Sequence, residues 1–302
     1  MTQQTTERFL NELSVRVFSG DWRGYRDMVV DGMVNVGDAR SVVHLGDDMH
    51  RRALASLSLR VRATGWDGLK VRVIRCTAFG RDLELVETLS TPMSGDKPAA
   101  APFAEAYLLR HGEDGMRVIA LLNPTSERFW NNGVRRDALP ARAEAAEAAE
   151  AIFRTVTAMH QAVQDKNLGA FLPWVDLPLT CFFPRDEAHC LDADGIRDML
   201  RRLQHMSSML ASHTVKIVDM ARFGDALIAA RFEVHTTLHD GQRRDPYHNL
   251  YFLRQGPDGW RVALVASATI GRLLPPEGAS EPQSAASPHG MNLPHGMNPK
   301  DD

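Results

Sequence analysis

The stretch Tyr107-Leu-Leu-Arg-His-Gly-Glu-Asp-Gly-Met-Arg-Val118 returns 144 residues later as Tyr251-Phe-Leu-Arg-Gln-Gly-Pro-Asp-Gly-Trp-Arg-Val262. Eight of the twelve positions are identical: Tyr, Leu, Arg, Gly, Asp, Gly, Arg and Val. The Asp-Gly pair in each copy favours a hairpin turn between two strands. Phe79-Gly80 and Phe223-Gly224 share this offset, as do Asp21 and Asp165. An offset that persists along the chain predicts two copies of one structural unit, here called the first and second repeats.

The bulk composition is that of an ordinary globular protein, with 302 residues, 44% hydrophobic and 24% charged. A net charge of -3 gives no electrostatic reason to expect nucleic acid or an anionic membrane as a partner. No apolar run is long enough to span a bilayer, and residues 1–7 lack the pattern of a secretory signal. Three scattered cysteines (Cys76, Cys181, Cys190) predict no disulfide framework. We therefore expect a cytoplasmic protein.

Apolar periodicity predicts the elements of the first repeat. A helix over Thr6–Phe18 ends at Gly20, and a second helix covers about 47–62. Four strands are then expected, at Leu69–Phe79, Asp82–Thr91, Phe103–His111 and Met116–Asn123.

The second repeat follows the same plan. A long helix is expected over Pro140–Asp165, with Phe153, Val156, His160 and Val163 toward its buried part. A short strand at Leu179–Phe183 precedes a helix that Asp192 or Asp194 caps and that reaches about Met209. The four expected strands are Thr214–Arg222, Ala226–His239, Tyr247–Arg254 and Trp260–Thr269.

The predicted fold class is α+β, with two tandem domains in which helices precede a curved, four-stranded antiparallel sheet. The predicted boundaries are residues 1–124 for the first repeat, 125–144 for a linker and 145–270 for the second repeat. Residues 271–302 are rich in Pro, Gly, Ser and Ala and predict a disordered tail.

This order of elements, with its closing motif, resembles the SnoaL-like / nuclear transport factor 2-like superfamily. Tyr251–Val262 matches the superfamily's aromatic strand, glycine turn and Trp-Arg-aliphatic strand, and Tyr107–Val118 matches with Met116 in place of Trp. The acidic residues Asp21 and Asp165 after the opening helices also fit. The resemblance covers about 6–124 and 145–270. It implies cone-shaped domains that hold ligands inside and pair through the outer faces of their sheets, so the two repeats would form an internal pseudo-dimer.

The resemblance also implies an acidic general base inside a cone, sometimes with His or Tyr. Asp176 is the nearest match by position, because it precedes the strand at Leu179 in an apolar setting. The alternative is a loop carboxylate that caps or turns the chain before Pro178. Asp31 in the first repeat carries the same two interpretations.

Among the histidines, His248 shares a strand face with Leu250 and Phe252, which favours an interior position and a catalytic role. His235 shares its face with Arg231 and Glu233, which favours an outer or interface position. A structural histidine is the alternative in both places. No histidine pair has the spacing of a dedicated metal site, so we expect neither a metal nor a cofactor.

Tyr247, Asn249 and Tyr251 alternate on one strand face. They could orient a small apolar or aromatic ligand, together with Trp260, or form a polar interface between the repeats. If the cones hold no ligand, aromatic side chains such as Phe153, Phe182 and Trp260 would fill them.

One pair of equivalent positions differs in charge. Glu87 corresponds to Arg231 on the shared offset. If the sheets pack about a pseudo-two-fold axis, these residues would face each other and favour pairing of unlike repeats.

The functional hypothesis is a non-catalytic small-molecule-binding or assembly protein, because the sequence shows no convergent acid–base set in either repeat. The first repeat is expected to be the more degenerate, since residues 34–43 carry few polar groups. The alternative is a small-molecule lyase, isomerase or hydrolase acting in the second cone. There Asp176 would be the general base, with His248 and Tyr247 or Tyr251 donating to a developing oxyanion.

Overall fold

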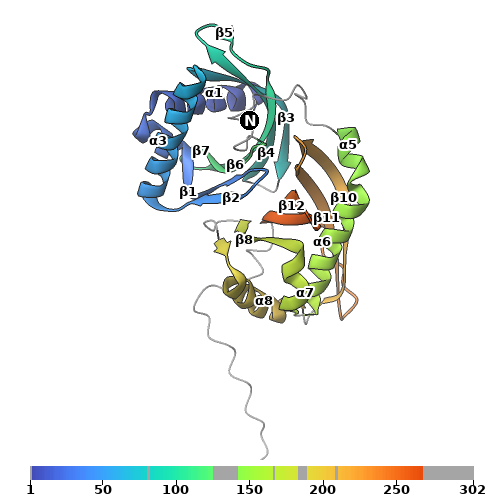
Figure 1. The fold of residues 1–302 in the computed structure, drawn as a ribbon. Coiled ribbons are helices and arrows are strands. Elements are labelled where there is room, and N and C mark those ends of the chain that lie inside the picture. The colour runs from blue at the N-terminus through green and yellow to red at the C-terminus, as the bar shows by residue number, and fades with distance from the viewer. Residues whose placement is uncertain are drawn as a thin grey trace, which may run out of the picture.

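The computed structural model describes residues 2–79, 82–124, 142–165, 167–182, 189–207 and 210–267. Figure 1 shows the N-terminal and C-terminal halves as two bodies that lie side by side. Residues 125–141 of the predicted linker, Phe183 and the predicted tail lie outside the described residues.

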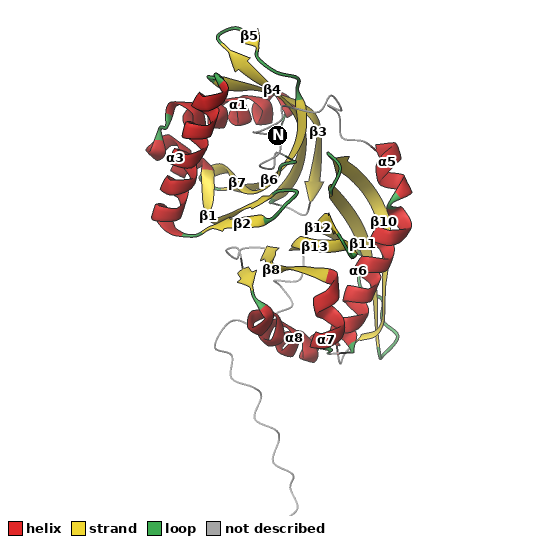
Figure 2. Cartoon of the chain, viewed as in Figure 1, coloured by secondary structure: helices red, strands yellow, loops and turns green. Residues whose placement is uncertain are grey.

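The first repeat is a curved sheet with helices against its concave side (Figure 2). Its helices are α1 (Gln3–Ser19), α2 (Trp22–Met28) and α3 (Gly46–Thr64), and its strands are β1 (Val29–Val36), β2 (Ser41–His44), β3 (Gly68–Phe79), β4 (Leu83–Ser94), β5 (Lys97–Pro98), β6 (Phe103–Gly112) and β7 (Gly115–Leu122). The sheet order is β2-β1-β7-β6-β4-β3, with β5 paired to β4. β1 runs parallel to β7, and the other pairings of this sheet are antiparallel.

The second repeat has the same architecture. Its helices are α5 (Arg142–Glu147), α6 (Ala149–Gln164), α7 (Leu168–Phe171), the 3-10 helix η1 (Leu172–Trp174) and α8 (Ala193–Ser207), and its strands are β8 (Val175–Phe182), β9 (His189–Leu191), β10 (Leu210–Phe223), β11 (Leu227–Leu238), β12 (Tyr247–Gly256) and β13 (Gly259–Ser267). The sheet order is β10-β11-β12-β13-β8-β9, and β8 runs parallel to β13. The α+β class and the two-repeat organisation predicted from the sequence are therefore confirmed.

Each repeat buries an apolar core between its helices and the inner face of its sheet. In the first repeat, Leu10 and Leu13 of α1 and Leu54 of α3 pack with Tyr107 and Leu109 of β6. In the second, the core includes Ile152 and Val156 of α6, Leu200 of α8, Tyr251 and Leu253 of β12, and Trp260 of β13. On both β6 and β12, the inner positions are therefore the odd-numbered residues.

The outer faces of the two sheets pack against each other and form a third apolar cluster. Leu83, Leu85 and Leu108 of the first repeat share this cluster with Leu250 and Phe252 of the second. Each sheet is therefore covered on both faces, by its own helices inside and by the other repeat outside. This packing fits the pseudo-dimer that the resemblance implied.

Three sequence predictions about these elements are wrong. In the described residues the two sheets are mixed and have seven and six strands, rather than four antiparallel strands each, because β1 and β8 add to them in parallel. The strand β1 was not expected, because Asp31 and Gly32 interrupt its apolar pattern and Gly32 adopts a positive φ of 77°. The helix expected over Pro140–Asp165 is divided between α5 and α6, and Phe153 is 41% exposed rather than buried.

The offset of 144 does not extend to the beginning of the repeats. Asp21 caps α2 by accepting the amide hydrogen of Gly24, and Asn167 caps α7 by accepting that of Ala170. These equivalent caps are 146 residues apart, so the equivalence of Asp21 and Asp165 is wrong.

No helix in the described part of the chain is both long enough and apolar enough to cross a membrane.

Candidate functional site

A buried carboxylate lies on the inner face of the first sheet. Glu105 of β6 is 2% exposed. Its Oε2 accepts hydrogen bonds from Ser90 Oγ at 2.6 Å and from Tyr107 Oη at 3.1 Å. Its Oε1 accepts one from Asn123 Nδ2 at 2.6 Å. Three donors from β4, β6 and the end of β7 thus converge on one carboxyl group.

Burial raises the pKa of Glu105 to about 7, because a carboxylate away from water is costly in its charged form. The hydrogen bonds from Ser90 and Tyr107 oppose this rise by stabilising the charge. Burial also raises the pKa of the Tyr107 hydroxyl, and the neighbouring Glu105 adds to that shift. At neutral pH, Glu105 is therefore poised between its acid and its base forms, while Tyr107 keeps its proton.

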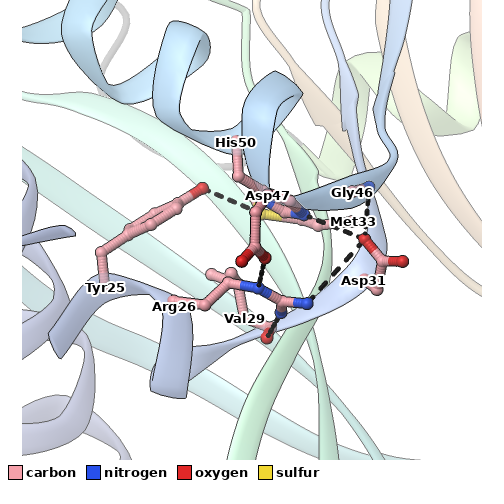
Figure 3. A network of polar contacts seen from close by, with 8 residues as sticks. All are labelled: Tyr25, Arg26, Val29, Asp31, Met33, Gly46, Asp47 and His50. Atoms are coloured by element: carbon pink, nitrogen blue, oxygen red, sulfur yellow. Dashed lines mark hydrogen bonds and ion pairs between the residues drawn. The ribbon is translucent and has the colours of Figure 1, made fainter. Parts of the chain in front are cut away.

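A second polar group joins α2, β1 and α3 of the same repeat (Figure 3). Asp31 Oδ1 accepts the amide hydrogen of Gly46 at 2.7 Å and lies 3.7 Å from His50 Nε2. Arg26 donates from Nε to Asp47 at 2.9 Å and from Nη1 to the carbonyl of Val29 at 3.2 Å. Asp31 therefore caps the N-terminus of α3, which agrees with the interpretation of this residue as a capping carboxylate.

Two imidazoles lie beside this network. His50 is fully buried, and neither of its ring nitrogens has a hydrogen-bond partner. Its ring centroid lies 5.6 Å from that of His44 and 6.1 Å from that of Tyr25. Burial lowers the pKa of His44 to about 4 and also lowers the pKa of His50, so both rings are neutral near pH 7.

The second repeat has an uncharged cluster in the matching place. Tyr251 of β12 lies with its hydroxyl 2.6 Å from His160 Nε2 of α6, and it accepts a hydrogen bond from Asn249 Nδ2 at 2.9 Å. The ring of His213 lies 4.6 Å from that of His160. Burial lowers the pKa of His160 to about 3 and that of His213 to about 4. With His160 neutral, both hydrogen bonds at the Tyr251 hydroxyl form when Tyr251 donates its proton to Nε2 and accepts one from Asn249 Nδ2.

Several buried polar atoms around this cluster lack a partner. They are Asn249 Oδ1, His213 Nε2 and Thr236 Oγ1. Buried polar atoms without a partner are costly, so these three atoms are the ones in this cluster that keep an unused hydrogen-bonding capacity.

The predicted acid–base residues of the second repeat do not join this cluster. Asp176 forms an ion pair with Arg254 Nε at 3.0 Å, and Arg254 Nη2 also donates to Ser41 Oγ of the first repeat at 2.8 Å. His248 is partly exposed and lies 3.8 Å from Glu233. Glu233 also contacts His235 at 2.6 Å, on the outer sheet face.

The expected interior position of His248 is wrong. It shares a strand face with Leu250 and Phe252 as predicted, but these two residues belong to the cluster between the repeats. The inner face of β12 carries Tyr247, Asn249 and Tyr251 instead. Both faces of this strand are covered, so apolar neighbours such as Leu250 and Phe252 do not identify the inner face.

The aromatic residues expected to fill the second cone are dispersed. Trp260 belongs to the core under α6, where its carbonyl accepts a hydrogen bond from Thr155 at 3.3 Å. Phe182 lies in the cluster between the repeats, and Phe153 is exposed.

Glu105 was not among the residues predicted from the sequence, although the repeat carries a signal for it. Glu105 is the only charged residue in Phe103-Ala-Glu-Ala-Tyr-Leu-Leu109. It also shares a face with Tyr107, and on the offset of 144 it corresponds to Asn249, which shares a face with Tyr251. Glu105 lies outside residues 34–43, which were the basis for expecting the first repeat to be the more degenerate.

Among the described residues, no group of three or more His, Cys, Asp or Glu side chains is placed to hold a metal ion.

No protein-family profile matches the chain, and no curated protein matches it by sequence. Solved structures of nuclear transport factor 2-like and ketosteroid isomerase-like proteins each match about two fifths of it. A ketosteroid isomerase-like protein from Erwinia carotovora atroseptica is 16% identical over 40% of this chain and 95% of its own, with a TM-score of 0.33. A nuclear transport factor 2-like protein of unknown function from Shewanella oneidensis is 10% identical over 39% and 97%, with a TM-score of 0.33. A putative aromatic ring hydroxylase from Novosphingobium aromaticivorans is 16% identical over 40% and 88%, with a TM-score of 0.32.

Proposed function

We propose that the chain binds a small molecule inside the first repeat and that Glu105 exchanges a proton with it, as in a lyase, isomerase or hydrolase that uses general acid–base chemistry. The observation that carries this proposal is the buried carboxylate of Glu105 with its three converging donors. A group whose pKa is close to 7 can both accept and return a proton at neutral pH.

The neighbours of Glu105 suit such a cycle. While Glu105 is ionised, the hydroxyls of Ser90 and Tyr107 donate to its Oε2. When Glu105 takes a proton from the ligand, its negative charge moves to the ligand and the carboxyl becomes neutral. The two hydroxyls can then donate to the new oxyanion on the ligand. Return of the proton to another atom completes an isomerisation, and its delivery to a leaving group completes an elimination.

A phenol tests this proposal without knowledge of the substrate, because a phenolate resembles an oxyanion flanked by an apolar ring. We would titrate 4-nitrophenol, whose colour reports its ionisation, into the whole protein between pH 5 and 9. The probe itself ionises within this range, so the informative quantity is the ratio of the two affinities. The affinity of the natural chain relative to that of Glu105→Gln is expected to change with pH around 7. Asn249→Ala is the matched control at the equivalent position of the second repeat. Equal pH profiles for the natural chain and Glu105→Gln would contradict the proposal.

A non-catalytic binding function in the second repeat is the second candidate. It is favoured by the unpartnered Asn249 Oδ1 and Thr236 Oγ1 near the Tyr251–His160 pair. This cluster offers hydrogen bonds but no carboxylate, so it suits a neutral ligand with an apolar or aromatic body. Under this alternative, 4-nitrophenol binding would be lost in Tyr251→Phe and kept in Glu105→Gln.

A further inference from the structure

Four charged residues lie on the outer sheet faces where the two repeats meet. In the first repeat, Arg75 of β3 pairs in register with Glu87 of β4, with Arg75 Nη1 3.9 Å from Glu87 Oε1. In the second repeat, Asp219 of β10 pairs in register with Arg231 of β11. Glu87 is 2% exposed, so this charge is buried by the contact between repeats.

These residues are equivalent in the two repeats. Arg75 and Asp219 are 144 residues apart, as are Glu87 and Arg231. A register shift precedes Arg75 on β3, and the same shift precedes Asp219 on β10. The backbone thus presents both pairs in the same way, with the signs of the charges exchanged.

The contact between the repeats joins equivalent positions. Arg75 Nη1 lies 2.8 Å from the carboxylate of Asp219. A residue can touch its own counterpart only close to the axis that relates the two copies, so the pseudo-two-fold axis passes near this ion pair. Two copies of the first repeat related by this axis would place arginine against arginine. Two copies of the second would place aspartate against aspartate.

We propose that Arg75, Glu87, Asp219 and Arg231 form a recognition surface that selects the pairing of unlike repeats and rejects the pairing of like repeats. The ion pair between Arg75 and Asp219 is the attractive part of this surface, and the like charges that would meet in the wrong pairing are the repulsive part. The partner of each outer sheet face is therefore the other kind of repeat. The expected facing of Glu87 and Arg231 across the axis stays a prediction, and the contact that the structure places between the repeats is Arg75–Asp219.

The test inverts the charges of one repeat within the whole chain. Asp219→Arg with Arg231→Glu gives the second repeat the charges of the first, and it keeps both the net charge and an opposite-charge pair within the repeat. The unfolding equilibrium constant is expected to rise on the order of tenfold, because partners in one charge network are coupled. Arg75→Asp with Glu87→Arg makes the reciprocal change and should have a similar effect.

The chain with all four substitutions restores opposite charges across the axis. It is expected to recover most of the stability lost by either half-inversion, as measured by urea unfolding, with the oligomeric state followed by light scattering. The exposed Asp258–Arg261 pair, at 2.9 Å, gives a matched control, and its inversion should have little effect. If a half-inversion does not fold, recovery of folded protein in the fourfold variant would support the proposal. A fourfold variant no more stable than the half-inversions would overturn it.

Discussion

The inner faces of the two sheets differ most at one pair of equivalent positions. Glu105 and Asn249 each lie two residues before a tyrosine and each hydrogen bonds to it. In the first repeat the buried group is a carboxylate with a pKa of about 7, and in the second it is a neutral amide beside a neutral histidine. The same scaffold therefore carries one inner site that can exchange a proton near pH 7 and one built on neutral hydrogen bonds.

The residues around these positions explain why only one repeat tolerates the charge. Ser90, which donates to Glu105, is replaced by Val234 in the second repeat, and Asn123 is replaced by Ser267. Valine cannot donate a hydrogen bond, so a carboxylate at 249 would lose the shortest contact made by a hydroxyl in the first repeat. A buried charge needs such donors to be stable.

The largest expected effect comes from placing that charge in the second repeat. Asn249→Glu should lower the free energy of unfolding by about 3–5 kcal/mol at pH 8, because it leaves a buried carboxylate short of donors. The loss should be smaller at pH 5, where the new carboxyl is protonated. Asn249→Gln is the control, since it has the same size and no charge. Urea unfolding at both pH values checks the prediction, and equal losses for both variants would contradict it.

Removal of the charge from the first repeat should produce the next largest effect. The pKa of Glu105 is about 7 in the fold against 4.5 for an unperturbed carboxyl, so the unfolded chain loses this proton first as the pH rises. The stability that this group contributes is therefore complete below pH 4.5 and is lost as the pH rises through 7. The expected loss is about 3 kcal/mol.

Glu105→Gln should abolish this part of the pH dependence. The measurement is the difference in free energy of unfolding between the natural chain and the variant from pH 4.5 to 8. A difference that does not change over this range would show that Glu105 keeps an ordinary pKa. Ser90→Ala should instead strengthen this pH dependence. It removes a donor to the carboxylate and so raises the pKa of Glu105 further.

Substitution of the two equivalent tyrosines should change stability less, and the pH dependence of the loss should differ between the repeats. Tyr251→Phe leaves Asn249 Nδ2 and His160 Nε2 without their shared partner, which should cost about 1–3 kcal/mol. Tyr107→Phe removes one of three donors to Glu105, so its cost should depend on pH and be greater above pH 7, where the carboxyl is charged. Thermal unfolding of both variants at pH 5.5 and 8 distinguishes these responses. A cost for Tyr107→Phe that is the same at both pH values would remove the link between this hydroxyl and the charge.

The sequence predicted the elements of these repeats better than the orientation of their faces. The strands around the Asp-Gly turns were predicted to within a few residues, because turn residues and apolar runs are local signals. The inner face of β12 was assigned wrongly, since Leu250 and Phe252 are apolar through contact with the other repeat rather than with α6. Which face points inward depends on packing between distant segments, and alternation alone does not reveal it.

The same limit explains the prediction of Asp176. Its local setting is apolar, as a general base would require, but Arg254 from the end of β12 lies 3.0 Å away and pairs with it. This partner is 78 residues distant in sequence. Glu105, in contrast, could have been found by reading the offset of 144 for differences as well as for identities, because a carboxylate opposite an amide stands out on a shared strand face.

The smallest effects test how the repeats align at their beginnings. Asn167→Ala should cost about 1 kcal/mol, because Asn167 caps α7 by accepting the amide hydrogen of Ala170 at 3.0 Å. Asp21→Ala should also be destabilising, since Asp21 caps α2 through Gly24 at 3.1 Å. Asp165→Ala should change stability little, because its carboxylate accepts a hydrogen bond from the exposed Gln161 at the end of α6 and caps no helix N-terminus. Thermal unfolding of the three variants decides between an offset of 146 and one of 144. A loss in Asp165→Ala that matched the loss in Asp21→Ala would restore the alignment read from the sequence.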